Sequence, residues 1–218
     1  MYNKLKRLAL LFLIAIMLLS SFSFTAATSS SIKSSPNAIS LKKAKVSYPK
    51  KKAYTGAIHE IPVKVTLNGE TLVEGVDYLI SGNETSGAKA KKYKISFVIV
   101  GIGHYKGFIT KSFSYTITKV SQKLSVKAAD ETQTVVVNYS DLKSGSQTVQ
   151  VNIEDTVLGE SITPKLVWKT TKKIKAYQNG TIVIPKGLKK GTYTLKVYAQ
   201  SSTNYNKSSY QYIKIKVV

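Results

Sequence analysis

The stretch Gly101-Ile102-Gly103-His104-Tyr105-Lys106-Gly107 decides the fold, because of the two runs that flank it. Residues 92–100 (KYKISFVIV) precede it and residues 108–117 (FITKSFSYTI) follow it. Both runs are rich in β-branched and aromatic residues, which favour strands. Two such runs joined by a short glycine-rich segment predict a β-hairpin. We expect this hairpin to be the last of a β-sandwich domain, with a second domain after it.

The same glycines partly match the G-x-G-x-x-G motif of dinucleotide-binding proteins. The third glycine, Gly107, comes one residue too late, and the run after it alternates as a strand does. The motif requires a helix whose N-terminus holds the pyrophosphate. We therefore predict that these glycines occupy turn positions with positive φ, and we predict no cofactor.

The N-terminus has the three-part pattern of a secretory signal. Basic residues in the first seven positions precede an apolar run of 12 residues, 8–19, and small residues follow up to Ala27. We predict a signal peptide over residues 1–27, cleaved after Ala27, and a polar linker over 28–38. The alternative is an uncleaved anchor, which the short run disfavours, because a spanning helix needs about 20 residues. No membrane span is then expected after cleavage, and we expect no covalent wall anchoring through the C-terminus.

The charge is strongly positive. The chain has 33 Lys+Arg against 11 Asp+Glu, a formal net charge of +22. Removing residues 1–27 takes away three basic residues and no acid, which leaves +19. The only arginine is Arg7, and arginine is the usual residue for bidentate recognition of guanine and phosphate. We therefore exclude specific nucleic-acid binding.

The lysines have two interpretations. Their field can attract extracellular polyanions such as anionic cell-wall polymers. The favoured alternative is that they keep strands soluble and protect sheet edges, because many of them alternate with apolar residues. Since the chain has no cysteine, its domains must be stable through packing alone.

Strand-like runs separated by turn signals at 8 to 12 residues fill the rest of the chain, without a helical period. This pattern predicts an all-β protein, with β-sandwiches over residues 39–119 and 120–218. Asn68-Gly69, between alternating runs, predicts a two-residue type I′ turn. The predicted strands are 40–48, 61–67, 70–73, 78–81, 92–100, 108–117, 123–127, 132–139, 147–153, 166–170, 181–184, 192–199 and 209–218, with a turn at 140–145.

Two groups of motifs carry a family resemblance. Asn68-Gly69, Gly75 and Asp77-Tyr78, followed by the glycine-rich hairpin, resemble the immunoglobulin-like repeat of Gram-positive bacterial surface proteins, in which Asn is commoner than His at position 104. Residues 138–143 and 185–193 with Asn204-Tyr205 are similar to a cadherin- or immunoglobulin-like module found beside that repeat. The predicted fold-defining turn residues are Asn68, Gly69, Gly75, Asp77, Gly101, Gly103, Tyr105, Gly107, Gly187, Gly191, Tyr193, Asn204 and Tyr205.

The resemblance implies tandem immunoglobulin-like sandwiches that act as stalks, spacers or adhesive units outside the cell. We expect a secreted or wall-associated monomer, and a non-enzymatic one. Its partner would be an anionic wall polymer or another surface protein. The alternative function is a carbohydrate-binding module that uses exposed Tyr or Trp.

Catalytic and metal sites are weakly indicated. Two histidines, His59 and His104, are too few for a zinc site without cysteine. Two acidic clusters, Glu70, Glu74 and Asp77, and Glu154, Asp155 and Glu160, could each hold calcium, which takes six to eight oxygens. For Asp77 the favoured interpretation is a turn cap formed by its own side chain. No nucleophile motif or isolated carboxylate pair stands out, so no catalytic or metal-binding residues are predicted. Trp168 is interpreted as a packing residue, with sugar stacking as the alternative.

Overall fold

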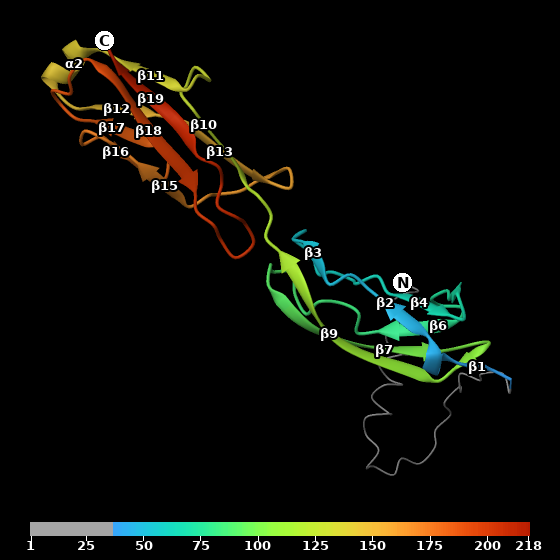
Figure 1. The fold of residues 1–218 in the computed structure, drawn as a ribbon. Helices are drawn as coiled ribbons and strands as arrows, with labels where there is room; N and C mark the ends of the chain where they lie inside the picture. Colours follow the sequence, from blue (N-terminus) through green and yellow to red (C-terminus); the bar gives the residue numbers. More distant parts are fainter. Residues whose placement is uncertain (1–36) are drawn as a thin grey trace, which may run out of the picture. The chain divides into compact units, whose positions relative to one another are not determined.

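The computed structural model describes residues 37–218, which form two compact units of β-strands (Figure 1). The first unit, here called the first domain, runs to Lys52 and resumes over Gly56–Ile117; the second consists of Ala53–Thr55 and Thr118–Val218. The strand spacing did not predict that residues 53–55 group with the second domain. The predicted signal peptide and most of the linker lie outside the described residues. Within residues 37–218, no helix has the length and apolarity needed to cross a bilayer.

The first domain places a four-stranded sheet, β3-β9-β7-β6, beside a three-stranded sheet, β2-β4-β5, and a small pair, β1-β8. The predicted hairpin is confirmed: β7 and β9 pair antiparallel from Lys92↔Thr116 to Val100↔Phe108. Its inward residues alternate with exposed ones along β7 and form much of the core. The strands are β1 Ile39–Ser40, β2 Lys45–Ser47, β3 Lys51–Ala53, β4 Lys64–Leu67, β5 Glu70–Thr71, β6 Tyr78–Ser81, β7 Lys92–Gly101, β8 Tyr105–Lys106 and β9 Phe108–Thr118.

The second domain has a four-stranded sheet, β11-β19-β18-β15, and two three-stranded sheets, β10-β13-β14 and β12-β17-β16. Seventeen buried hydrophobic residues from these sheets and their connections pack into one core. The strands are β10 Lys123–Lys127, β11 Thr134–Val137, β12 Gln147–Gln150, β13 Asn152–Val157, β14 Glu160–Ser161, β15 Leu166–Lys169, β16 Lys175–Ala176, β17 Thr181–Ile184, β18 Gly191–Ala199 and β19 Gln211–Val217.

The two domains share a tyrosine at the start of an equivalent long strand. The hydroxyl of Tyr93 donates to the carbonyl of Lys89 at 2.9 Å, and that of Tyr193 donates to Lys189 at 2.8 Å. A tyrosine that reaches back four residues in this way is the tyrosine corner of immunoglobulin-like sandwiches. The all-β prediction is therefore confirmed: the chain forms tandem immunoglobulin-like sandwiches.

We expect Tyr93→Phe and Tyr193→Phe each to destabilise their own domain by about 1 kcal/mol, because each loses one hydrogen bond and no packing. Chemical unfolding measures both: fluorescence of the lone tryptophan reports the second domain, and the part of the circular dichroism transition that the tryptophan does not report belongs to the first. An unchanged unfolding midpoint for both variants would show that these hydrogen bonds do not contribute to the stability of the domains.

Strands β3, β14 and β16 were not predicted, and three further segments differ from the sequence prediction. The strand expected over 40–48 is interrupted by a 3₁₀ turn, Leu41–Lys43, because the Leu41 side chain turns in and becomes fully buried. The turn expected over 140–145 is a short helix, α2 Tyr139–Ser144, whose Leu142 is fully buried. The strand expected to end at Ile153 continues to Val157 after a break at Val151.

The second domain also contains a hairpin turn that the sequence did not reveal. Leu158 and Gly159 have φ of 55° and 88°, and Val157 pairs with Glu160 across them. At the corresponding turn of the first domain, Asn68 and Gly69 have φ of 52° and 92°, as a type I′ turn requires. Leucine is poorly suited to this conformation, whereas asparagine tolerates it.

A reciprocal exchange tests this comparison. We expect Leu158→Asn to stabilise the second domain by about 0.5–1 kcal/mol and Asn68→Leu to destabilise the first by a similar amount. Both side chains are exposed, so packing changes little. Thermal unfolding of the two variants is the measurement, and a destabilised Leu158→Asn protein would contradict the prediction.

Candidate functional site

The predicted turn residues near Asp77 serve the fold. Asp77 Oδ2 accepts a 2.7 Å hydrogen bond from the backbone N–H of Val73, and Gly75 has φ of 84°. The carboxylate thus caps its own turn, which is the alternative to a calcium ligand. Gly103 and Gly107 lie in the β7–β9 connection with φ of 61° and 88°, as predicted. Gly101 instead ends strand β7, pairs with Tyr78 and does not have positive φ, contrary to the prediction.

In each domain a tyrosine and the polar residue before it bind the chain segment that enters that domain. These pairs are His104-Tyr105 and Asn204-Tyr205. In the first, β1 runs parallel to β8, and the N–H of Ile39 donates to the carbonyl of His104 at 2.8 Å. In the second, Val120 forms a parallel bridge with Tyr205 and donates to Asn204 at 3.1 Å. Gly187 and Gly191, with φ of 74° and 147°, flank the loop that precedes β18. The contacts of Ile39 and Val120 bind the entering segment to a hairpin within each domain.

The two histidines lie in opposite environments. His104 is exposed at the hairpin tip, whereas His59 is only 4% exposed and its ring lies 3.5 Å from the Tyr115 hydroxyl. Burial, and secondarily the charge of Lys52, lowers the pKa of His59. Because the unfolded chain then binds the proton more readily, the first domain should lose stability as the pH falls below the usual histidine pKa of about 6.5.

We expect His59→Gln to flatten this pH dependence, because the group that binds the extra proton on unfolding is gone. His104→Gln is the matched control, since it removes the chain's other histidine from an exposed position. Urea unfolding between about pH 5 and pH 7.5 measures the effect. The account is wrong if the His104 variant alone flattens the curve.

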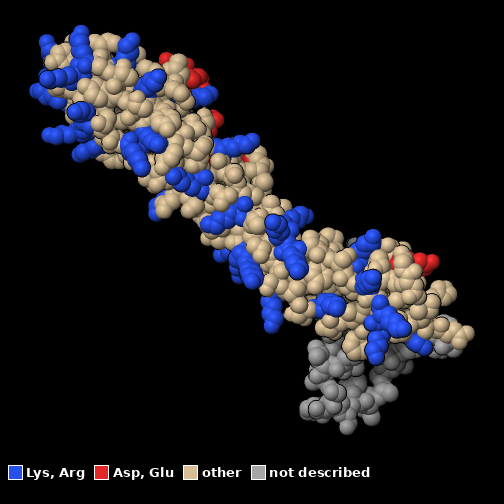
Figure 2. All heavy atoms as spheres, viewed as in Figure 1, with Lys and Arg blue, Asp and Glu red and all other residues tan. Residues whose placement is uncertain are grey.

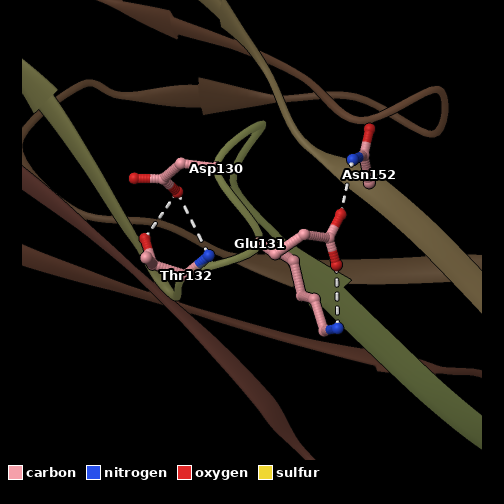
Figure 3. Close-up of polar contacts among 5 residues, drawn as sticks. Asp130, Glu131, Thr132 and Asn152 are labelled. Atoms are coloured by element: carbon pink, nitrogen blue, oxygen red, sulfur yellow. Dashed lines mark hydrogen bonds and ion pairs between the residues drawn. The ribbon is translucent and has the colours of Figure 1, made fainter.

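The acids of the second domain are partly engaged in local contacts. In the loop before β11, Asp130 accepts hydrogen bonds from the backbone and hydroxyl of Thr132 at 3.1 and 2.7 Å (Figure 3). Glu131 pairs with Lys127 at 2.9 Å and accepts a bond from Asn152. Thr132 lowers the pKa of Asp130, and Lys127 lowers that of Glu131. Among residues 37–218, no three His, Asp or Glu side chains gather as metal ligands would.

Asp155 is the one acid of the predicted clusters that is buried. It lies on the inner face of β13 and is 2% exposed, and neither carboxylate oxygen has a hydrogen-bond partner. Burial raises its pKa, which the nearby amide of Thr156 offsets only in part. Its neighbour Glu154 points outward and is exposed. The cluster 154–160 is therefore divided between the core and the surface.

Trp168 does not form an exposed aromatic platform, and a hollow in the first domain lacks carboxylates and histidines. Trp168 packs partly buried against the core, and its Nε1 donates to the carbonyl of Tyr177 at 3.0 Å. A shallow hollow of about 350 Å³ in the first domain is lined by Ser47, Tyr48, Pro49, Pro62, Val63 and Lys64. No carboxylate or histidine lines it, so it has no group for acid–base catalysis at neutral pH.

A cluster of lysines and tyrosines covers part of the β11-β19-β18-β15 sheet. Tyr198 and Tyr210 meet edge to face at 5.1 Å, and Lys196 Nζ lies 3.7 Å from the centre of the Tyr210 ring. Lys207 Nζ lies 4.2 Å from both rings and donates to the Tyr210 hydroxyl at 2.9 Å. Sequence reasoning missed this cluster, because its members come from three separate segments.

The positive charge of this cluster affects the pKa of the Tyr210 hydroxyl. The hydrogen bond from Lys207 lowers the pKa of Tyr210, and the charges of Lys207, Lys169 and Lys196 contribute to the same shift. Lys196 also lies 5.6 Å from the Tyr212 ring, which is 43% exposed. Cation–π contacts of this kind attract ammonium groups to the faces of aromatic rings.

Comparison with known proteins adds little to this geometry. No protein-family model matches the sequence, and no curated protein does. The chain is similar to the protocadherin GammaB4 extracellular domain (14% identity, TM-score 0.35) and to Sidekick-1 immunoglobulin domains 1–5 (11%, 0.35). These alignments cover 80% of this chain but only 33% and 39% of those chains.

The Ig1-2 module of the Drosophila receptor protein tyrosine phosphatase DLAR is similar at 9% identity and a TM-score of 0.29. That alignment covers 80% of this chain and 98% of the other. The strand order and the two tyrosine corners, rather than these similarities, define the fold.

Proposed function

We propose that this protein is an extracellular, non-enzymatic immunoglobulin-like module that serves as a spacer or adhesion unit and is held on anionic cell-wall polymers by its lysines. The excess of lysine over acid, +19 after removal of the predicted signal peptide, is the observation that carries the proposal. A field of this sign attracts polyanions without any shaped pocket. The sandwiches themselves supply stable spacing.

The distribution of the charges supports this interpretation. Figure 2 shows lysines spread over the surface in this view, with the acids of the second domain confined to one margin. Two acids of the second domain, Asp130 and Glu131, are already engaged in local contacts with Thr132 and Lys127. The carbohydrate-binding alternative is weakened, because Trp168, the residue best suited to stack on a neutral sugar, packs against the core.

The test is sedimentation with purified Gram-positive cell wall, intact or stripped of its anionic polymers. We expect the protein to pellet with intact wall at low salt, and to stay in solution with stripped wall or at high salt, because salt screens exposed charges. Retention on stripped wall at high salt would reject the electrostatic proposal and favour the carbohydrate-binding alternative. Absence of retention throughout would leave a spacer that has a protein partner.

A further inference from the structure

The outward face of the β11-β19-β18-β15 sheet concentrates positive charge in aligned rows. The strand register places Lys169 opposite Lys196, and Lys196 opposite Tyr212. Lys214 and Lys216 continue the outward side of β19, and Lys207 covers the rings of Tyr198 and Tyr210 from the connecting loop. We call this set the lysine–tyrosine face: Lys169, Lys196, Lys207, Lys214, Lys216, Tyr198, Tyr210 and Tyr212.

Nothing within the four strands neutralises these lysines, since none of their described residues is Asp or Glu. Like charges directly opposite each other across a sheet are destabilising, yet Lys169 and Lys196 occupy such a pair. Lys196 is held over Tyr210, so its ammonium group cannot move far away without losing that contact. An anionic partner would relieve the repulsion and find its cations already ordered.

The equivalent sheet of the first domain differs in the pairing of its lysines. On the outward side of β7, Lys92 faces Thr116 and Lys94 faces Ser114. Tyr93 and Tyr115, which pair across this hairpin, are both buried in the core. In the first domain Lys91 Nζ lies 4.9 Å from the centre of the Tyr93 ring, whereas three lysines lie within 6.0 Å of the centre of the Tyr210 ring in the second. This convergence of lysines is more than solubilising a strand requires.

We propose that the lysine–tyrosine face is the site at which the protein binds a flexible anionic polymer built of sugar or polyol units that carry phosphate or carboxylate groups. The proposal rests on the function proposed above and assigns its charge-dependent binding to one face. Neighbouring strands lie about 4.8 Å apart and alternate residues on a strand about 6.7 Å apart. A polymer with repeated anions can therefore contact several of these lysines at once, which raises its affinity over that of a single anion.

The tyrosines favour such a polymer over a nucleic acid. Single-stranded nucleic acids gain affinity by stacking bases on open aromatic rings. The Tyr210 ring has Lys196 and Lys207 within 4.2 Å of its centre, and Lys207 lies equally near that of Tyr198. Their rings are thus engaged by ammonium groups, and the five lysines offer cations and hydrogen-bond donors to an anion rather than platforms for bases.

The test measures the affinity of the full chain for purified poly(glycerol phosphate) at low salt. The triple variant Lys169→Gln, Lys196→Gln, Lys207→Gln should bind at least about tenfold more weakly, because it removes three ordered cations. The matched control, Lys92→Gln, Lys94→Gln, Lys111→Gln, removes the same charge from the first domain and should bind within about threefold of the original. Replacing the same three face lysines by arginine should preserve binding and exclude a folding defect as the cause.

The other outcomes are equally distinct. An equal loss in both glutamine variants would overturn the assignment to this face while leaving binding by net charge intact. No binding of poly(glycerol phosphate) by the original protein would overturn both proposals. Displacement by single-stranded DNA of equal charge at a lower concentration than the polymer itself would overturn the choice of ligand. Free glycerol phosphate should not compete at the same phosphate concentration, and competition by it would show that single anions suffice.

Discussion

Gly82→Ala is expected to destabilise the first domain by about 2–5 kcal/mol, enough at the upper end to unfold a marginal domain. Gly82 has φ of +84°, a conformation that costs an L-residue about 1–2 kcal/mol. An added Cβ would also meet the backbone carbonyl oxygen of Ser96 at a contact too short to exist without a shift of the main chain. Overpacking of this kind adds about 1–3 kcal/mol.

Gly69 provides the matched control in the same domain. Its φ is +92°, but an added Cβ would have nothing within 4 Å. Gly69→Ala should therefore show the conformational cost alone, about 1–2 kcal/mol. The second domain contains the same pair of cases, because a Cβ on Gly180 would meet the carbonyl of Val151 and one on Gly159 would meet nothing.

Domain-resolved unfolding separates these four variants. Trp168 is the only tryptophan and belongs to the second domain, so its fluorescence reports that domain alone. Circular dichroism reports both domains. Equal losses for Gly82→Ala and Gly69→Ala would mean that the backbone around β7 adjusts freely, contrary to a close-packed sandwich.

Asp155→Asn should stabilise the second domain by about 1–2 kcal/mol at neutral pH, because it removes a buried carboxyl that has no hydrogen-bond partner. The pKa of Asp155 is raised in the folded protein, so folding is favoured most when the carboxyl is protonated in both states. As the pH rises above the unfolded pKa of about 3.9, the unfolded state ionises first and stability is lost. The gain from Asn should therefore disappear at low pH.

Glu154→Gln is the control, since Glu154 is the exposed neighbour on the same strand and should give no such gain. Urea unfolding followed by Trp168 fluorescence near pH 3.5 and pH 7 compares the variants. Destabilisation by Asp155→Asn at pH 7 would mean that the ionised carboxylate has a favourable partner, such as a bound cation, and would return the cluster 154–160 to consideration as a calcium site.

The local features of the fold could be predicted from the sequence because they depend on neighbouring residues. Alternation along residues 92–100 and 108–117 was enough for the central hairpin, and Asn68-Gly69 was enough to locate a turn. The corresponding turn in the second domain was missed, because Leu158 is an unusual residue at positive φ. The surrounding strands impose the conformation there, against the preference of the residue.

Other features depend on register and tertiary packing, which the sequence pattern does not contain. The helix α2 forms around one buried leucine within a segment rich in turn residues. Asp155 was grouped with Glu154 and Glu160 as a possible calcium cluster, and the strand was expected to end at Ile153. The continuation of the strand to Val157 places the Asp155 carboxylate inside. The lysine–tyrosine face forms only when three segments are aligned in the folded domain. From the sequence alone, only the alternation of its lysines with apolar residues could be recognised.

The salt dependence of binding to purified poly(glycerol phosphate) tests the central claim most directly. The proposal that lysines hold this protein on anionic polymers predicts an affinity that falls at least about tenfold between 0.1 M and 1 M salt, as the screening length shrinks from about 10 Å to about 3 Å. An affinity that stays constant over this range would contradict it, because contacts that do not weaken with salt are not made by exposed charges.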